Sequence, residues 1–299
     1  ELGYKRLIKS LELGYAPVNQ YRRLCYGGAK KLLLVAQIMT LLDIISEKSE
    51  DGINVVIEIM FSVLYDIKEK SIEFSKELRK SYLSFLKRTN LVEHYCKYRQ
   101  LSSKMDRIFD FIINDSEFSD ELSALLENTI KTANEFYSYR VVRILQVFVR
   151  YFPKQTFDML FAHTKNSKLF LGLRDRESVE LFRYADEKSI IEWCNVYPNE
   201  RYAFIASICP LFVEIKSHDK GTNPAFNLTS LSIALTINAS DKKSILTLLA
   251  NKLYPMSGAG RKSKELEMRL IAFEKLNISE DVELSEQFAK IKEFWLEKI

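Results

Sequence analysis

The residues best suited to bind a phosphate group lie between Gly258 and Ser263, where the chain reads Gly-Ala-Gly-Arg-Lys-Ser. In a phosphate-binding loop, backbone N–H groups surround the phosphate and a lysine reaches it. The motif that would end at Lys262 and Ser263 needs glycine at positions 261 and 256, and this chain has Arg261 and Met256 there. We therefore interpret the segment as a joint between helices, with Gly258 in a tight turn that excludes a side chain.

Arg88 and His94 form a second arrangement that could do chemistry. A charged guanidinium and a titratable imidazole beside one phosphate could support the cleavage of RNA. The spacing resembles the loose Arg-x(4–6)-His pattern of HEPN ribonucleases, which are small helical proteins. Short patterns of this kind also arise by chance, so the other interpretation is a surface pair near a helix joint.

The remaining candidate catalytic and metal-binding residues are scattered. His94 and Cys96 could supply two metal ligands, but no second pair stands at a spacing typical of zinc sites. The four cysteines (Cys25, Cys96, Cys194 and Cys209) include no C-x-x-C pair and are expected to be reduced thiols of a cytoplasmic protein. We expect no metal, no cofactor and no enzymatic activity in this chain.

Three arginines point instead to binding of a partner. On a helical wheel, Arg143 and Arg150 lie about 60° and 80° from Arg140, so the three share one face, and no acidic residue lies between 136 and 157. Either the acidic residues of 108–135 neutralise these arginines from neighbouring helices, or an acidic surface of a protein partner does so. We predict the second role, binding of a protein partner, for Arg140, Arg143 and Arg150.

The elements that must position these residues are helices. The chain has nine glycines and six prolines in 299 residues, about 5%, whereas about 12% is average. Apolar residues recur with the 3.6-residue period almost throughout, which predicts an all-α fold. The expected helices cover residues 3–13, 17–25, 29–47, 53–68, 71–88, 91–113, 118–134, 136–151, 154–165, 176–184, 187–197, 199–214, 226–237, 241–253, 263–276 and 280–298.

Many helices joined by short links indicate a degenerate helical-repeat array, a HEAT-like or TPR-like α-solenoid, although no strict sequence period is present. The stretch 217–227 is rich in Gly, Pro, Asn and Ser and predicts an exposed loop. We therefore expect a helical array over 1–216 and a helical segment over 217–299 that continues or caps it. No apolar run is long enough to cross a membrane.

Two short stretches resemble elements of a known family. The stretch 192–201, with Trp193, Pro198 and Arg201, resembles a "W–acidic/polar–P–x–x–R" element late in the helical C-terminal region of bacterial STAND NTPases, including AVAST-type antiviral proteins. Residues 254–261 resemble their "P–x–W/x–S–G–S" joint, with Ser257 and Gly258, although Met256 replaces the usual tryptophan. The match covers about the last third of the chain.

The resemblance implies that the chain is a helical sensor region of a larger bacterial antiphage defence protein, which recognises a viral protein. Trp193, Pro198, Arg201, Ser257 and Gly258 would then be packing and joint residues. The alternatives are a HEPN-like RNase that uses Arg88 and His94, and a nucleic-acid-binding helical solenoid, for which a net charge of +4 is mild. Oligomers would form through domains outside this chain.

Overall fold

A computed structural model describes residues 2–15, 17–25, 35–48, 50–69, 76–88, 91–97, 102–114, 117–135, 139–163, 167–175, 178–215, 225–254, 262–276 and 282–297. Helices account for 85% of these residues, and two short strands are the only β-structure among them. The prediction of a helical fold is therefore confirmed. The chain divides into two compact units, Glu1–Tyr151 and Phe152–Ile299, called here the N-terminal and the C-terminal unit.

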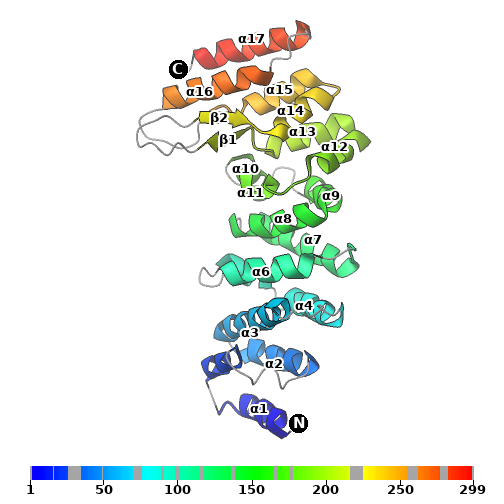
Figure 1. Cartoon of the computed structure of the whole chain (residues 1–299), viewed down its shortest axis with the longest axis vertical. Coiled ribbons are helices and arrows are strands. Elements are labelled where there is room, and N and C mark those ends of the chain that lie inside the picture. The colour runs from blue at the N-terminus through cyan, green and yellow to red at the C-terminus, as the bar shows by residue number, and fades with distance from the viewer. Residues whose placement is uncertain are drawn as a thin grey trace. The chain divides into compact units, whose positions relative to one another are not determined.

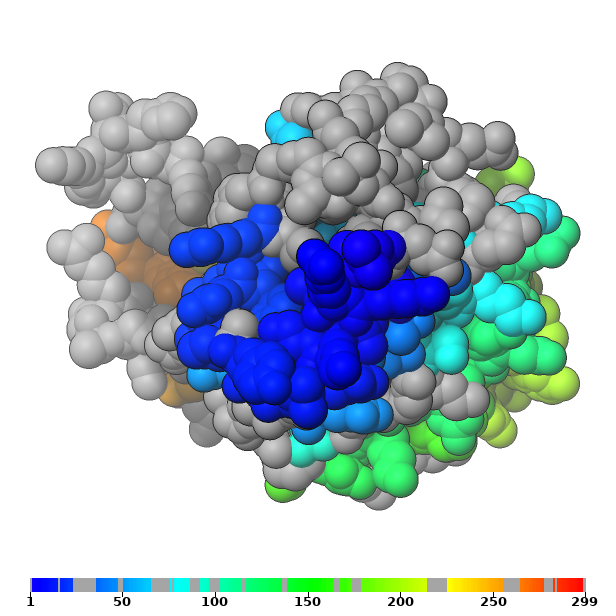
Figure 2. Space-filling model, turned by 90° about the horizontal axis from the view of Figure 1, so that it is seen from below, coloured from blue at the N-terminus to red at the C-terminus, as the bar shows by residue number. Residues whose placement is uncertain are grey.

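The N-terminal unit contains helices that follow one another in chain order (Figure 1). They are α1 (Leu2–Glu12), η1 (Val18–Cys25), α2 (Val35–Lys48), α3 (Glu50–Glu69), α4 (Lys76–Arg88), α5 (Leu91–Lys97), α6 (Ser102–Ile113), α7 (Asp120–Glu135) and α8 (Tyr139–Tyr151). In the view from the α1 end, the residues of α1 and η1 lie in front (Figure 2).

These helices pack as two rows. In the first row, η1 contacts α3, α3 contacts α6, and α6 contacts α8. In the second row, α2 contacts α4 and α4 contacts α7. The rows are joined by contacts between α2 and α3 and between α7 and α8. Apart from α1 and the short α5, successive helices of the chain therefore lie in opposite rows.

Side-chain contacts give the direction of the helices in the first row. Glu58 of α3 pairs with Lys104 of α6, and Phe61, one turn further along α3, lies under Arg107, one turn further along α6. Both members of the second contact lie three residues after those of the first. The two helices therefore run in the same direction, as alternate helices of an up-and-down array do.

The sequence of α8 shows why the rows form a core. Val141, Val142, Ile144, Leu145, Phe148 and Val149 are all buried, while Arg143 and Arg150 are exposed. This spacing places the apolar side chains on a broad inner face. Val142 and Leu145 lie wholly within this core, since neither exposes any surface.

The C-terminal unit has a similar arrangement. Its elements are α9 (Pro153–His163), α10 (Lys168–Asp175), α11 (Ser178–Phe182), α12 (Glu187–Val196), α13 (Pro198–Ile208), β1 (Phe212–Ile215), β2 (Ala225–Leu228), α14 (Ser230–Asn238), α15 (Lys242–Ala250), α16 (Lys262–Phe273), η4 (Glu274–Leu276) and α17 (Val282–Leu296). One row is α9, α12 and α14, and the other is α10, α13, α15 and α17. Helix α16 lies against β2.

The predicted helices 199–214 and 226–237 are wrong at residues 212–214 and 226–228, which belong to an antiparallel hairpin of strands 212–215 and 225–228. Pro210 has no N–H and disfavours helical geometry at the preceding Cys209, whose φ and ψ are −71° and 151°. The β-branched and aromatic residues that follow favour a strand. Within the hairpin, the rings of Phe212 and Phe226 lie 5.7 Å apart.

Helix ends follow the sequence signals where the structure describes them. Pro153 and Pro198 are the first residues of α9 and α13. Asp241 caps α15 by accepting a hydrogen bond of 2.9 Å from the backbone N–H of Ser244. Gly14, after α1, has a φ of +67°, a conformation that glycine adopts without strain.

The predicted joint at Ser257 and Gly258 lies outside the described residues. Residues 217–224 of the expected loop also lie outside them. No helix that the structure describes is both long and apolar enough to span a lipid bilayer.

The compact units differ from the two segments expected from composition. The expected boundary falls at residue 217, whereas the units meet at 151 and 152. The reason is that α12 and α13, before residue 216, pack against α14 and α15, after residue 224. The stretch rich in Gly, Pro and Asn therefore interrupts one unit and does not separate two.

Candidate protein-binding surface

The three arginines predicted to bind a partner all lie on α8, but Arg140 faces the protein interior. Arg140 is 4% exposed, and its Nη1 donates hydrogen bonds to the carbonyl oxygens of Tyr95 at 2.9 Å and Cys96 at 3.5 Å. These carbonyls belong to the last turn of α5, where a cation is favourable for the helix dipole. Arg140 thus joins α8 to the end of α5 and is not part of an exposed stripe.

Arg143 is held at the surface by a carboxylate of the neighbouring helix. Its Nη1 lies 2.6 Å from Oδ2 of Asp106 on α6, and its side chain is 43% exposed. The hydrogen bond to Asp106 raises the pKa of the Arg143 guanidinium. The other oxygen of Asp106 accepts a hydrogen bond from the Tyr95 hydroxyl. Burial, together with this hydrogen bond, raises the pKa of Tyr95.

Arg150 occupies a similar place two turns further along α8. Its Nη1 lies 3.6 Å from Oδ1 of Asp110, and both side chains are 47% exposed. The same carboxylate oxygen accepts a hydrogen bond of 3.3 Å from the Tyr151 hydroxyl. Burial and the charge of Asp110 raise the pKa of Tyr151.

Arg143 and Arg150 therefore share one exposed face, and Arg140 does not. The acidic band expected to face them, residues 108–135, supplies Asp110 as a partner of Arg150, whereas Asp106, the partner of Arg143, lies two residues before the band. Whether Arg143 and Arg150 bind a partner stays a prediction. Tyr139, 47% exposed with its ring centre 5.8 Å from the Arg143 guanidinium, extends this surface. Its position one turn before Arg143 is the sequence signal that could have found it.

The two residues of the RNase alternative are placed on different helices. Arg88 ends α4, and its side chain lies outside the described residues. His94 is 8% exposed in α5, and its Nε2 lies 3.2 Å from Oδ1 of Asn54 on α3. The imidazole is thus held inside the N-terminal unit.

A cluster in the C-terminal unit is centred on Arg201. Its guanidinium lies 4.2 Å from the ring centre of Trp193 and 4.8 Å from that of Tyr197. Nη1 donates to the carbonyl oxygen of Trp193 at 2.9 Å, and Nη2 donates to Oδ1 of Asp158 at 2.7 Å. The Trp193 indole N–H also donates to this oxygen, at 2.8 Å. The expected packing role of Trp193 and Arg201 fits this geometry.

Burial affects the thiols of Cys96, Cys194 and Cys209. Burial raises the pKa of Cys96 and of Cys194 to about 12, and burial also raises the pKa of Cys209. All three are free thiols. Because the thiolate is the nucleophile and the metal ligand, a raised pKa disfavours both roles for these side chains.

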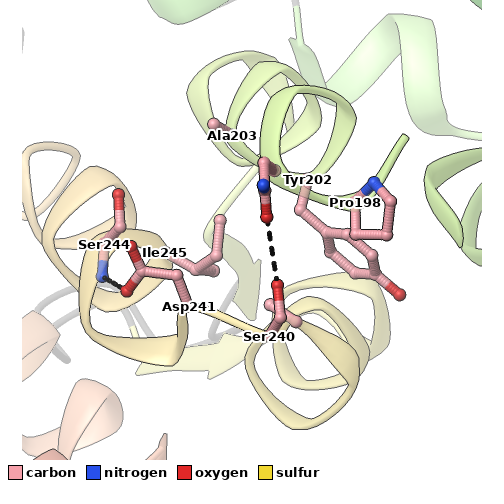
Figure 3. Close-up of a pocket in the computed structure, with 9 residues that line it drawn as sticks. Pro198, Tyr202, Ala203, Ser240, Asp241, Ser244 and Ile245 are labelled. Carbon is pink, nitrogen blue, oxygen red and sulfur yellow. Dashed lines mark hydrogen bonds between the residues drawn. The ribbon is translucent and has the colours of Figure 1, made fainter.

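A small pocket lies between the N-terminal ends of α13 and α15 (Figure 3). Its lining includes Pro198 and Tyr202 on one side and Ser240, Asp241 and Ile245 on the other. A volume of about 80 Å³ is well below the roughly 300–1,000 Å³ of sites for small molecules. The pocket is therefore too small to hold a typical cofactor.

Among the described residues, no three His, Cys, Asp or Glu side chains gather closely enough to hold a metal ion. Comparisons of the chain with protein families, with curated proteins and with solved structures find no match.

Proposed function

We propose that the chain is a helical-repeat array, of the HEAT-like or TPR-like solenoid type, that recognises a protein partner. The observation that carries the proposal is the packing of alternate helices into rows, with parallel neighbours within the first row of the N-terminal unit. Stacked helix pairs of this kind expose extended surfaces composed of equivalent positions on successive helices, and repeat proteins bind partners on such surfaces.

The spacing of contacts within the rows supports a repeat of variable length. Residues that meet on neighbouring helices of a row are separated by 37 positions for Asp106 and Arg143, and by 38 for Lys154 and Glu192. The separation is 40 for Thr247 and Gln287. TPR repeats have 34 residues and HEAT repeats roughly 40–47. A spacing that changes from pair to pair explains why the sequence has no strict period.

The partner in this proposal is a viral protein, and the chain is the sensor region of a larger antiphage protein in the bacterial cytoplasm. The resemblance of the stretch 192–201 to STAND NTPases supports this setting. So does the cluster of Trp193, Tyr197 and Arg201, which occupies the joint between α12 and α13, where a packing and joint role is expected.

Phage challenge of bacteria that carry the complete gene tests the proposed function. We expect resistance, and escape phages with changes in one viral protein that binds the purified chain. The proposal is contradicted if escape changes never map to a protein that binds the chain. It is also contradicted if the purified chain cleaves RNA and a His94→Gln variant, which keeps a hydrogen-bonding group opposite Asn54, does not.

A further inference from the structure

We infer that the outer face of the first row of the N-terminal unit binds an acidic, extended segment of the partner protein. This inference rests on the proposed function and specifies the chemistry of its partner. The face consists of the cations on η1, α6 and α8, with α3 between them, and is called here the basic row face: Arg22, Lys104, Arg107, Arg143 and Arg150.

The cations of the basic row face lie further out than most of their carboxylate partners. Glu58 is 13% exposed, whereas Arg22 and Lys104, which both pair with it, are 44% and 34% exposed. Asp106 is 27% exposed and its partner Arg143 is 43% exposed. A ligand approaching these positions therefore meets positive groups before it meets Glu58 and Asp106, whereas Asp110 is as exposed as Arg150.

Two arginines of the face retain donors for a ligand. Arg107 is exposed, and no described carboxylate lies within ion-pair distance of it; its contact is with the ring of Phe61, at 5.9 Å. Arg143 uses Nη1 for Asp106. Arginine has five N–H donors in a fork that matches a carboxylate. Both side chains can thus bind an additional carboxylate without losing the contact that holds them.

Exposed aromatic side chains flank these cations. Tyr139 on α8 and Tyr65 on α3 are each 47% exposed, and Tyr139 lies beside Arg143. Tyrosine and arginine are enriched among the residues that contribute most to protein–protein affinity. The combination of arginine and tyrosine therefore suits a peptide with both acidic and apolar side chains.

The carboxylates of the face favour a protein over a nucleic acid. Glu58, Asp106 and Asp110 lie among five cations, so the face carries a net charge of about +2. Nucleic-acid binding depends on the neutralisation of several closely spaced phosphates, and embedded carboxylates oppose it. An acidic peptide has fewer charges, and its own basic or polar groups can contact the embedded carboxylates.

The geometry of the row sets the spacing of the acidic residues. Neighbouring helices pack with their axes about 8–10 Å apart. A segment in the polyproline II conformation advances about 3.1 Å per residue with three residues per turn, so three residues span the distance from one helix to the next and every third side chain lies on the same face. The basic row face therefore fits a segment with an acidic residue at about every third position.

Fluorescence anisotropy with a labelled 18-residue peptide that has glutamate at every third position tests the inference. We expect binding that weakens at least tenfold in an Arg107→Glu, Arg143→Gln variant. The matched control is Lys80→Glu, Lys131→Gln, which makes the same charge change at exposed positions of the second row. We expect the control to bind within twofold of the unchanged protein.

The inference is overturned if the unchanged protein does not bind the peptide, if both variants weaken binding equally, or if an 18-nucleotide RNA binds more tightly than the peptide. Circular dichroism shows whether the double variant is folded. If it is not, Arg107→Gln alone carries the test, with an expected threefold loss. A viral protein that binds the unchanged chain and the Arg107 and Arg143 variants equally would overturn this inference and leave the proposed function standing.

Discussion

Arg143 in the N-terminal unit and Arg201 in the C-terminal unit make similar contacts in different surroundings. Each donates to an aspartate of a neighbouring helix, and each lies beside a tyrosine ring. Arg143 is 43% exposed, whereas Arg201 is 11% exposed and lies against two aromatic rings. The same side chain can therefore form part of a binding surface or hold a helix joint, and its burial decides which.

If Arg201 belongs to a structural joint, replacement of Trp193, on which it packs, should lower the free energy of unfolding more than replacement of Arg201 itself. Trp193 is 2% exposed and contacts Phe157, Phe161 and Phe204. We expect Trp193→Ala to lower the free energy of unfolding of the chain by about 3–5 kcal/mol, because it leaves a large cavity. Urea denaturation measures this, and a loss below about 1 kcal/mol would show that Trp193 is not a core residue.

Replacement of Arg201 should have the next largest effect. Arg201→Ala removes the hydrogen bonds to the Trp193 carbonyl and to Asp158, and we expect a loss of about 1–3 kcal/mol. Arg201→Lys is the matched control for charge. Because lysine lacks the planar fork that stacks on Trp193, we expect it to restore less than half of the loss. Full recovery of the free energy of unfolding in Arg201→Lys, measured in the same denaturation experiment, would mean that the positive charge alone accounts for the stabilisation.

The cap of α12, the helix that carries Trp193, makes the C-terminal unit sensitive to acid. Hydrogen bonds from the Ser189 hydroxyl and backbone N–H lower the pKa of the Asp186 carboxyl. Since its folded-state pKa lies below the unfolded value, the cap stabilises the folded state above about pH 4, and this contribution is lost as the pH falls further.

We therefore expect Asp186→Ala to cost about 1 kcal/mol at pH 7 and less at pH 3. Asp186→Asn keeps a capping oxygen, so it should recover most of the stability without the acid dependence. Thermal melts at the two pH values measure the difference. Equal losses of stability in Asp186→Ala at pH 7 and pH 3 would contradict a capping role for the ionised Asp186 carboxylate.

Replacement of Arg143 should have the smallest effect on stability. Its ion pair with Asp106 is partly exposed, and such pairs contribute about 0.2–1 kcal/mol. We expect Arg143→Ala to lower the free energy of unfolding by less than about 1 kcal/mol, and by less still in 1 M salt. A loss as large as that of Arg201→Ala would remove the contrast between surface and joint.

The sequence predicts those features of the fold that depend on residues close together along the chain. The 3.6-residue period of Val141, Leu145 and Phe148 predicts α8 and its buried face, and Pro153 and Pro198 predict the starts of two helices. These features depend on residues a few positions apart. Such features can therefore be predicted without knowledge of which helices pack against one another.

The parts that the sequence does not predict depend on contacts between distant residues. A helical wheel places Arg140 beside Arg143, but the carbonyls of Tyr95 and Cys96, 45 and 44 positions away, draw Arg140 into the interior. Asp106 meets Arg143 only because α6 and α8 are neighbours in a row. At Phe212 the apolar period predicts a helix, but the break at Pro210 outweighs it and a strand forms.

Arginine footprinting of the basic row face tests the central claim most directly. Phenylglyoxal modification of the chain, alone and with the glutamate peptide, is read by mass spectrometry at Arg107, Arg143 and Arg183. Arg183 is the internal control, since it is 50% exposed and ion-paired with Glu180 in the C-terminal unit. Recognition through the basic row face predicts that bound peptide slows the modification of Arg107 and Arg143 and leaves that of Arg183 unchanged. Equal modification of Arg107 and Arg143 with and without bound peptide would contradict it.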